Sequence, residues 1–383
     1  MVKFAKKVEK KFTPYWEQHK ISQIADRFDN LRVPVTASKR QKGSTPYYGA
    51  NGIQDYVNGY THDGEFLLIA EDGANDIRNY PVNYVNGKVW VNNHAHVIKG
   101  KANIANNLFL QYAFKSINIE SYLVGGGRAK LTAEVMMRLP IKLPSIEEQN
   151  KIGKLVHSLD DTITLHEEKQ KQLEQLKKAL LQKMFADKSG YPKIRFKGFS
   201  EPWEQVKSKE LFKNISDKNH SDLPVLSATQ QNGMVYRDNL AIDIKYDQKS
   251  LANYKKVSPT DFVISLRSFQ GGFEMSDKEG IVSPAYTVFN FKNRTNQSPI
   301  FWKYLFKRYN FIESLKKVTF GIRDGKAISF GQFGDTKPTY PSLKEQEEIG
   351  KFFEKLDRTI TLHAKKIESL KQLKQALLQQ MFI

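Results

Sequence analysis

The chain has 383 residues and no cysteine, and its 60 Lys and Arg residues outnumber 41 Asp and Glu residues, for a formal net charge of +19. This length suggests two or three domains. A hydrophobic content of 40% with 12% aromatics is typical of a globular protein and argues against a disordered chain. The missing cysteine excludes disulfides, thiolate metal sites and a cysteine nucleophile. The surplus of positive charge favours a polyanionic partner.

The start of the chain does not resemble a targeting segment. Residues Met1–Lys11 lack the continuous apolar stretch of a secretory signal. No apolar run in the chain approaches the roughly 18–20 residues that span a bilayer. We therefore expect a cytoplasmic protein with no membrane partner.

Residues 1–143 are predicted to form a first α+β domain. Short β-rich apolar runs at Phe66–Ala70, Val89–Val91 and Val97–Ile98 are separated by Gly, Asn and Asp, as strands and turns are. One amphipathic helix is expected to follow at Ile104–Lys115.

Residues 144–186 are predicted to form a long helix. From about Glu147 to Met184 it would extend roughly 57 Å at 1.5 Å per residue. Its apolar residues recur at alternating spacings of three and four, a stripe suited to packing against another helix. The segment Ala186–Phe199 contains two glycines and a proline, which predicts that the helix ends there.

Residues 187–340 are predicted to form a second α+β domain. Strands are expected at Phe262–Leu266 and Thr287–Phe291. A helix is expected at Pro299–Lys316, with Ser298 as its N-cap and proline at the first helical position.

Residues 341–383 repeat the first long helix about 197 residues later, with about 25 of 43 aligned positions identical. Both copies contain Pro-Ser-x-x-Glu-Gln, Ile-Gly, Leu-Asp-x-Thr-Ile and a final Met-Phe. The segments before them are related more weakly, in the same order. If the halves are related by a pseudo-twofold axis, the two helices pack antiparallel, with His166 and His363 as a polar contact that sets register. A protein of two similar halves is expected to bind a ligand with two halves, of which duplex DNA is the foremost.

A search for a catalytic site finds only weak candidates. The Asn/Asp-Pro-Pro-Tyr/Phe motif of an adenine methyltransferase is absent, and Gly321–Lys326 has neither the length nor the Ser/Thr of a P-loop. Asp243–Lys245 is a triplet that is common by chance. His94 and His96 could form a metal pair on a strand, but without a third ligand we favour hydrogen-bonded histidines. We expect no catalytic residue and no metal site.

Basic and amide side chains mark the segments that are suited to read DNA. Lys39–Lys42 precede a loop, Thr45–Val57, that is rich in Asn, Gln and Tyr, residue types that bind base edges and phosphates. The second domain has Ser227–Arg237 and Arg267–Gly272, and a basic turn precedes each long helix. The predicted DNA-binding residues are Lys39, Arg40, Lys42, Tyr47, Tyr48, Asn51, Gln54, Asn92, Asn93, Arg128, Lys130, Gln230, Gln231, Asn232, Arg237, Arg267, Ser268, Gln270, Tyr286, Arg323 and Lys326.

The doubled helix resembles the conserved region of type I restriction-modification specificity subunits, and the resemblance covers essentially the whole chain. Further similar segments lie in both domains: Tyr47–Ile53, Glu71–Ala74, Trp90–Val97, Arg195–Phe199, Arg267–Gly272 and Ile281–Val288. The Arg-Phe-x-Gly-Phe element of the second domain has no clear counterpart before Trp16.

The resemblance implies an α+β fold with two target recognition domains, 1–143 and 187–340, separated by two long antiparallel coiled-coil helices, 144–186 and 341–383. It implies a non-catalytic subunit in which each domain reads one half of a bipartite DNA target. The partners implied are double-stranded DNA, two methyltransferase subunits and restriction subunits. S-adenosylmethionine, ATP and Mg²⁺ would belong to those subunits, so this chain is expected to hold no cofactor.

Two rival functions remain at this point. One is a stand-alone nuclease or methyltransferase with a degenerate site, which would act on DNA without partners. The other is a purely structural coiled-coil scaffold, which would show no sequence-dependent DNA binding.

Overall fold

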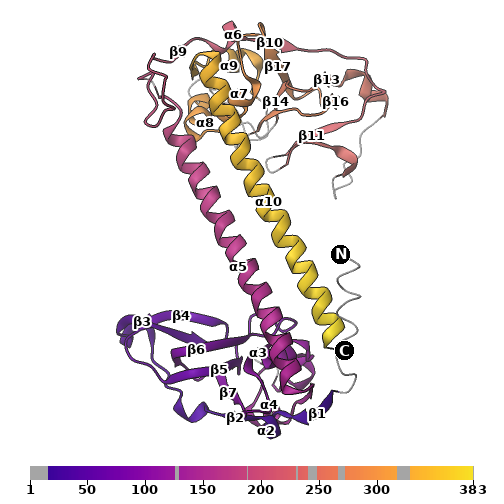
Figure 1. The fold of residues 1–383 in the computed structure, drawn as a ribbon. Helices are drawn as coiled ribbons and strands as arrows, with labels where there is room; N and C mark the ends of the chain where they lie inside the picture. Colours follow the sequence, from indigo (N-terminus) through magenta and orange to yellow (C-terminus); the bar gives the residue numbers. More distant parts are fainter. Residues whose placement is uncertain are drawn as a thin grey trace. The chain divides into compact units, whose positions relative to one another are not determined.

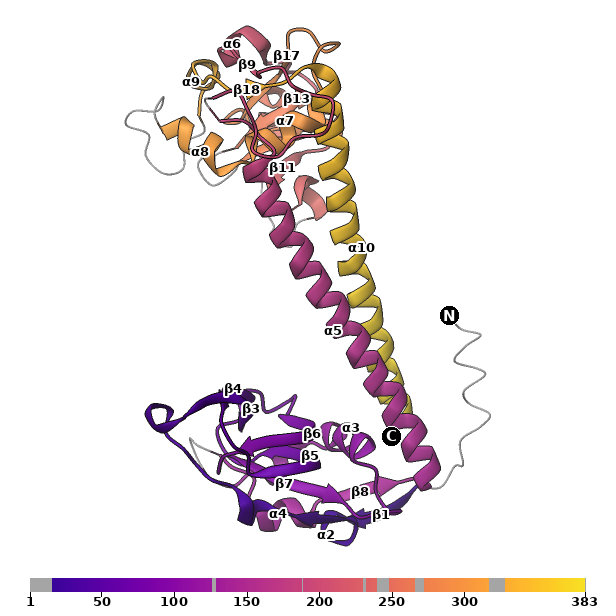
Figure 2. The same ribbon diagram turned by 60° about the vertical axis from the view of Figure 1, so that its left-hand side comes forward.

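The structure is a computed structural model (Figures 1 and 2) that describes residues 16–125, 129–187, 189–229, 232–239, 248–265, 272–316 and 328–382. The chain divides into two compact units. The first takes the residues up to Glu167 together with those from Lys365, and the second comprises Glu168–Ala364. Each unit thus contains one domain and part of each long helix, α5 (Ile146–Lys183) and α10 (Leu343–Met381).

The domain of the first unit is built on a mixed sheet with the strand order β2-β7-β5-β6-β3-β4. Neighbouring strands are antiparallel except β3 and β6, which are parallel. Strand β1 pairs with β8 in a separate ribbon. The elements are β1 (Glu17–Lys20), α2 (Ile21–Ile24), β2 (Ala25–Arg27), η1 (Asp29–Leu31), η2 (Ala37–Lys39), β3 (Lys42–Gly49), β4 (Gly52–Val57), β5 (His62–Ala70), β6 (Val82–Val91), β7 (Ala95–Gly100), α3 (Asn107–Ser116), η3 (Ile119–Tyr122), α4 (Ala133–Arg138) and β8 (Pro140–Leu143).

In the second unit the described strands form shorter sheets, of which the largest has the order β10-β17-β14-β15. The pairs β11–β12, β13–β16 and β9–β18 are antiparallel ribbons. The elements are β9 (Glu204–Gln205), α6 (Ser208–Leu211), β10 (Phe212–Ile215), β11 (Leu226–Thr229), β12 (Gly233–Tyr236), η4 (Arg237–Asn239), η5 (Gln248–Asn253), β13 (Lys255–Val257), β14 (Phe262–Ile264), β15 (Phe273–Met275), β16 (Gly280–Val282), β17 (Thr287–Phe291), α7 (Pro299–Phe306), α8 (Tyr309–Lys316), α9 (Phe330–Gly334) and β18 (Thr339–Tyr340).

The two domains share a common plan. The order β2-β7-β5-β6 in the first corresponds to β10-β17-β14-β15 in the second, and the ribbon β1–β8 corresponds to β9–β18. Each large sheet is followed in the chain by a helix, α3 or α7, that covers one of its faces (Figure 1). The weak sequence similarity between the domains therefore reflects a duplicated fold.

Alternating strand residues form two hydrophobic layers in each domain. In β5, Leu67 and Ile69 join the core beneath α3, whereas Phe66 and Leu68 join a second cluster on the opposite face of the sheet. In the second domain Phe262 joins the aromatic core beneath α7, whereas the next residue of the strand, Val263, joins a separate hydrophobic cluster.

Within each unit, one part of α5 packs antiparallel on the facing part of α10 (Figures 1 and 2). In the first unit Ile163 packs with Ile367 and Leu370, and Lys371 pairs with Glu167 at 2.6 Å. The predicted antiparallel seam and the fold class are confirmed. No helix among the described residues is both long and apolar enough to cross a membrane.

Two local predictions were wrong. The segment Thr45–Val57, predicted as a loop, is a hairpin of β3 and β4, because its aromatic and β-branched residues alternate around a turn at Ala50–Asn51. The helix predicted at Pro299–Lys316 is two helices, since the N–H groups of Lys307 and Arg308 bond to the carbonyls of the preceding turn and end α7.

Candidate nucleic-acid interface

The β3–β4 hairpin presents several of the predicted DNA-binding side chains to solvent. Lys39 and Lys42 are exposed just before and at the start of β3, and Gln54 is exposed on β4. Tyr48 is half-buried, and burial raises the pKa of its phenol. The hairpin therefore offers cations for phosphates and an amide for a base edge.

The turn of this hairpin is tied to the loop that follows β5. Asn51 Nδ2 donates to the carbonyl oxygen of Gly73 at 2.9 Å, and Asn51 Oδ1 accepts the N–H of Asn75 at 2.9 Å. Exposed Lys130 is attached to the same loop by a backbone bridge to Asp72. Asn51 and Lys130, which are far apart in the sequence, are thus held around one loop.

Two predicted DNA-binding residues lie inside the fold. Tyr47 is 1% exposed, and its hydroxyl accepts the N–H of Val35 at 3.0 Å and donates to the carbonyl oxygen of Val35 at 3.2 Å. Asn92 is 4% exposed, and its Oδ1 accepts the N–H of His94 at 2.8 Å. Enclosed side chains with these partners do not reach a base edge, so we correct the predicted surface by removing both.

Arg40 is committed mainly to the domain itself. Its guanidinium carbon lies 4.1 Å from the centre of the Tyr47 ring, its Nε donates to the carbonyl oxygen of Val35 at 3.1 Å, and its NH1 is 3.4 Å from an oxygen of Asp55. It stabilises the base of the hairpin, which leaves Lys39 and Lys42 as the exposed cations beside it.

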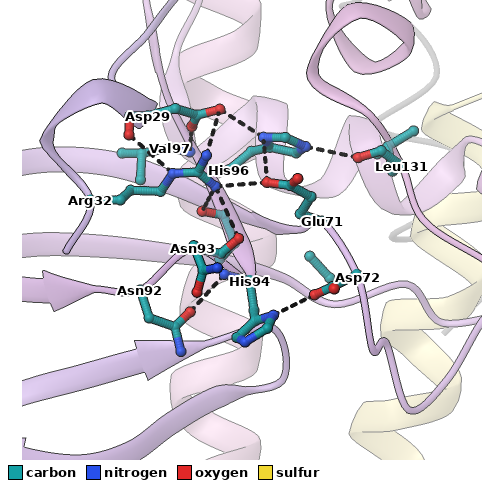
Figure 3. Close-up of polar contacts among 12 residues, drawn as sticks. Asp29, Arg32, Glu71, Asp72, Asn92, Asn93, His94, His96, Val97 and Leu131 are labelled. Atoms are coloured by element: carbon teal, nitrogen blue, oxygen red, sulfur yellow. Dashed lines mark hydrogen bonds and ion pairs between the residues drawn. The ribbon is translucent and has the colours of Figure 1, made fainter. Parts of the chain in front are cut away.

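A polar network that sequence reasoning missed lies behind this surface (Figure 3). His96 is 1% exposed; its Nδ1 is 2.8 Å from Asp29 Oδ2 and its Nε2 is 2.8 Å from the carbonyl oxygen of Leu131. The buried ring is therefore held through both of its nitrogens. Arg32 extends the network, with its NH1 donating to Glu71 at 2.8 Å.

Asp29 is the anion at the centre of the network. Burial alone would raise the pKa of Asp29, but hydrogen bonds from His96 and from the N–H of Val97, with the nearby charges of His96 and Arg32, lower it below its ordinary value. The carboxylate therefore stays ionised, pairs with the half-buried Arg32 and bonds to the buried ring of His96. The network fixes the start of β7 against the loop that follows β5.

The two histidines of the His-Ala-His triplet form hydrogen bonds with different partners. His94 Nδ1 lies 2.5 Å from Asp72 Oδ1, and His94 precedes β7 while His96 lies within it. The hydrogen-bonded interpretation of both is confirmed. Among the residues that the structure describes, no group of three or more His, Asp or Glu side chains is arranged to hold a metal ion.

Asn93 lies at the exposed rim of the same region. Its carbonyl oxygen accepts a hydrogen bond from Arg32 NH1 at 3.4 Å, and its side chain is exposed next to Asn92 and His94 (Figure 3). Asn51, Asn93 and Lys130 therefore surround the loop after β5. The signal that could have found this arrangement is the motif Glu71-Asp-Gly-Ala, whose first two residues bind Arg32 and His94.

In the second unit three predicted residues are described. Asn232 is exposed in the turn between β11 and β12, where its N–H donates to Thr229 Oγ1 at 3.1 Å. Arg237 is half-buried, with its Nε donating to Ser227 Oγ at 3.2 Å. Tyr286 is half-buried, and its carbonyl oxygen accepts Lys255 Nζ at 2.6 Å. The β11–β12 hairpin is the counterpart candidate for reading DNA.

The other predicted residues lie outside the described part of the chain: Arg128, Gln230, Gln231, Arg267, Ser268, Gln270, Arg323 and Lys326. The Gly321–Lys326 turn and the Asp243–Lys245 triplet lie outside it too. Their roles stay predictions.

A buried ion pair lies near the β11–β12 hairpin. Glu274 on β15 is 2% exposed and lies 2.8 Å from Lys307 Nζ. Burial raises the pKa of Glu274, while the charge and hydrogen bond of Lys307 oppose that change. A side chain added at Gly233 would contact the same carboxylate, at 3.6 Å from its Oε2.

The repeated Glu-Gln and Ile-Gly motifs join each domain to its own long helix. Gln149 Oε1 accepts the N–H of Asn106 at 2.9 Å just before α3, and its equivalent Gln346 accepts the N–H of Ser298 at 3.0 Å just before α7. A Cβ at Gly153 would lie 2.8 Å from the backbone nitrogen of Phe109, so only glycine fits without movement. The motifs allow a close helix crossing in both units.

The repeated aspartate of Leu-Asp-x-Thr-Ile joins three helices in each unit. In the first, Asp160 of α5 accepts the hydroxyl of Tyr112 on α3 at 2.9 Å and pairs with Lys374 of α10 at 2.5 Å. In the second, the equivalent contacts involve Asp357, Tyr304 and Lys177, with distances of 2.9 Å and 2.5 Å. Each domain is thereby fixed to both long helices.

The repeated terminal phenylalanine completes each domain core. Phe382 lies 5.2 Å from Phe109 and 5.6 Å from Trp16, between ring centres. Its equivalent Phe185 lies 5.2 Å from Phe301 and 6.1 Å from Trp203. Each long helix therefore starts beside one domain and ends in the core of the other.

Comparison with known proteins agrees with this duplicated plan. A family model described as "Type I restriction modification DNA specificity domain" matches residues 15–175 and again residues 200–372. The chain belongs to this family. The match occurs twice because the specificity domain itself is repeated, with one copy for each domain and its long helix.

Members of this family are similar to the chain over segments of different length. A type I restriction enzyme specificity subunit of Haemophilus influenzae is 45% identical over 139 residues, which are 36% of this chain and 36% of that protein. The match to the MjaX specificity subunit of Methanocaldococcus jannaschii covers 71% of this chain and 65% of that protein at 23% identity. The S.MpnORF507P specificity subunit of Mycoplasma pneumoniae is 23% identical, over 86% of each chain.

A solved structure shows the same fold over nearly the whole length. The type I restriction-modification system S subunit from M. genitalium superposes with a TM-score of 0.66 at 15% identity, covering 98% of this chain and 97% of that chain. The two chains therefore share one fold.

Proposed function

We propose that the chain is the DNA-reading specificity subunit of a type I restriction-modification complex. The two domains would each bind one half of a bipartite DNA target, in the cytoplasm where that DNA is found. The observation that carries the proposal is the duplication of one domain plan with different exposed side chains on equivalent hairpins. The helix contacts are repeated residue for residue, whereas the candidate DNA-reading residues are not.

The first domain supports this proposal through the surface around its β3–β4 hairpin. Exposed Lys39 and Lys42 suit phosphates, and exposed Gln54 suits an adenine edge. The formal charge of +19 adds a long-range attraction for DNA. The Asp29–His96–Arg32 network ties the start of β7 to the loop after β5, beside this surface.

We propose that the chain itself does no chemistry. In the first domain the buried His96 and the half-buried Arg32 are held by Asp29 and Glu71, so these side chains serve the fold. Methylation with S-adenosylmethionine, and any cleavage driven by ATP and Mg²⁺, would belong to two methyltransferase subunits and to restriction subunits. The long helices would set the spacing of the half-sites and dock those subunits.

The test is to purify the chain with and without its methyltransferase subunit and to measure DNA binding and methyl transfer. We expect methyl transfer to target DNA only from the complex. Methyl transfer or Mg²⁺-dependent cleavage by the chain alone would establish the rival enzyme function. DNA binding without sequence preference, alone and in the complex, would favour the scaffold function.

A further inference from the structure

A groove of the same construction occurs once in each unit, where the end of a domain helix meets the last turns of a long helix. Groove A, in the first unit, has a volume of about 590 Å³. Groove B, in the second unit, has a volume of about 700 Å³. Groove A is lined by Lys115, Lys374, Gln375, Leu378, Gln379 and Phe382. Groove B is lined by the sequence equivalents Lys307, Lys177, Lys178, Leu181, Gln182 and Phe185.

The two grooves share an apolar floor and a cationic rim. Leu378 and Phe382 form the floor of groove A, as Leu181 and Phe185 do in groove B, and these residues are identical in the two copies of the helix. Glu174 and Asp187 in groove B and Asp160 in groove A are the acidic side chains that line them, and lysines outnumber these carboxylates.

Each groove contains a partly buried cation that makes no ion pair with the described residues. The nearby carboxylates, Asp160 in groove A and Asp187 in groove B, attract it only from beyond ion-pair distance. In groove A this is Lys115, whose pKa is lowered by burial and by the neighbouring charge of Lys374. In groove B the equivalent of Lys115 is Lys307, which pairs with Glu274, so the cation is the next residue, Arg308. Burial lowers the pKa of Arg308 to about 10, and its guanidinium donates a hydrogen bond to the carbonyl oxygen of Ala186 at 3.4 Å. Among the described residues, neither cation lies within ion-pair distance of a carboxylate.

This combination fits an acidic peptide better than DNA. A phosphodiester backbone has no apolar side to place on a Leu-Phe floor, whereas a peptide segment can place apolar side chains there and a carboxylate on the cation. Because the same groove occurs twice on repeated residues, its occupant is expected to be present in two copies.

We propose that grooves A and B are the two docking sites for an acidic, partly apolar segment of the methyltransferase subunit, one copy per groove. The inference rests on the proposed function, which supplies a partner present in two copies. It goes further by assigning the docking to these two grooves and to Lys115 and Arg308.

The test is native mass spectrometry of the full chain reconstituted with the methyltransferase subunit of the same system. The double variant Lys115→Glu with Gln375→Glu makes the lining of groove A more acidic. The double variant Arg308→Glu with Lys178→Glu does the same in groove B. We expect two methyltransferase copies on the unmodified chain, one on either groove variant and none on the variant that combines them. Lys99→Glu with Lys292→Glu, both exposed and outside the grooves, is the matched control and should keep two copies.

The outcomes separate the inference from the proposed function. If the unmodified chain binds no methyltransferase subunit, the proposed function fails. If it binds two copies and both groove variants do so as well, with unchanged melting temperatures, only the groove inference is overturned. Groove variants that keep two copies and lose DNA affinity would show that the grooves bind phosphate, which also overturns it. Lys115→Arg, which keeps the charge, should retain both copies.

Discussion

At the residue scale, the molecule depends on polar side chains that are enclosed in the fold rather than displayed on it. His96 is 1% exposed, and both of its ring nitrogens lie within hydrogen-bond distance of partners inside the domain. Asp29 is one of these partners, and it also accepts the backbone N–H of Val97 at 2.7 Å. Removing Asp29 would leave the buried ring of His96 and the half-buried guanidinium of Arg32 without their shared carboxylate.

We predict that Asp29→Ala lowers the free energy of unfolding by about 3 kcal/mol at pH 7, the cost of breaking a buried pair. Because the folded pKa of Asp29 lies below its unfolded value of about 3.9, its contribution is fully present above that value and is lost as the pH falls through the folded pKa. The difference between variant and parent should therefore hold from pH 7 to pH 5 and shrink below about pH 4.

Urea unfolding at these pH values measures the difference. Asp63→Ala, which removes an exposed carboxylate of the same domain, is the control and should change stability by less than about 0.5 kcal/mol. A difference for Asp29→Ala that grows as the pH falls would contradict the assigned role.

A second residue prediction concerns the repeated glycine of the long helices. Gly153→Ala is expected to destabilise the protein by about 1–3 kcal/mol, because the new Cβ would lie 2.8 Å from the backbone nitrogen of Phe109. Gly350→Ala should cost less, since the nearest atoms, a side-chain carbon of Ile300 and the backbone nitrogen of Phe301, are both farther away, at 3.2 Å. Gly331→Ala in α9 has room, with its nearest atom at 3.9 Å, and should be neutral or stabilising.

Thermal melting of the three variants decides this point. Equal effects of Gly153→Ala and Gly331→Ala would show that the close approach of α3 to α5 is not required.

At the scale of elements, the β3–β4 hairpin separates two kinds of DNA contact. Lys42→Ala should weaken binding to all sequences about equally and reduce the slope of log affinity against log salt concentration by about 0.9, the loss of one phosphate contact. Gln54→Ala should leave the salt slope unchanged and reduce discrimination at one base pair by about 1–3 kcal/mol. Fluorescence anisotropy with DNA duplexes at several salt concentrations distinguishes the two results, and matching slopes for both variants would contradict the assignment.

The helices and strands also differ in how well they could be predicted from the sequence. The long helices were predictable because their apolar stripe and repeated motifs are local signals, and α5 and α10 lie inside the predicted segments. The break between α7 and α8 was not, because no glycine or proline between Ile300 and Lys316 marks it in the sequence. The hairpin was mistaken for a loop because its Gly, Asn and Tyr content resembles that of a loop.

The candidate site was predictable only in part, for a related reason. Residue type identified Lys42, Asn51 and Gln54 as suited to DNA, and all three are exposed. The same criterion selected Tyr47 and Asn92, whose burial depends on long-range packing. The network of Asp29, Arg32, Glu71 and His96 joins residues up to 67 positions apart, so no local pattern could reveal it.

At the scale of the whole molecule, the proposed function has two parts. The long helices set the distance between the two half-sites, and the domains read the base sequence of each half-site. Inserting one heptad in each helix adds about 10.5 Å of helix, which corresponds to about three base pairs at 3.4 Å per step. We predict that the unread gap of the methylated target lengthens by about three base pairs while both half-sites stay the same. An unchanged gap would contradict a role of the helices in spacing.

The central claim is that each domain reads its own half of the target. The most direct measurement is genome-wide mapping of methylated adenines in cells that carry this chain with its methyltransferase subunit, compared with cells in which Phe199–Lys337 has been exchanged for the second domain of another family member. The proposed function predicts that one half-site changes while the other half-site and the gap are retained. A change in both half-sites, or in neither, would contradict it.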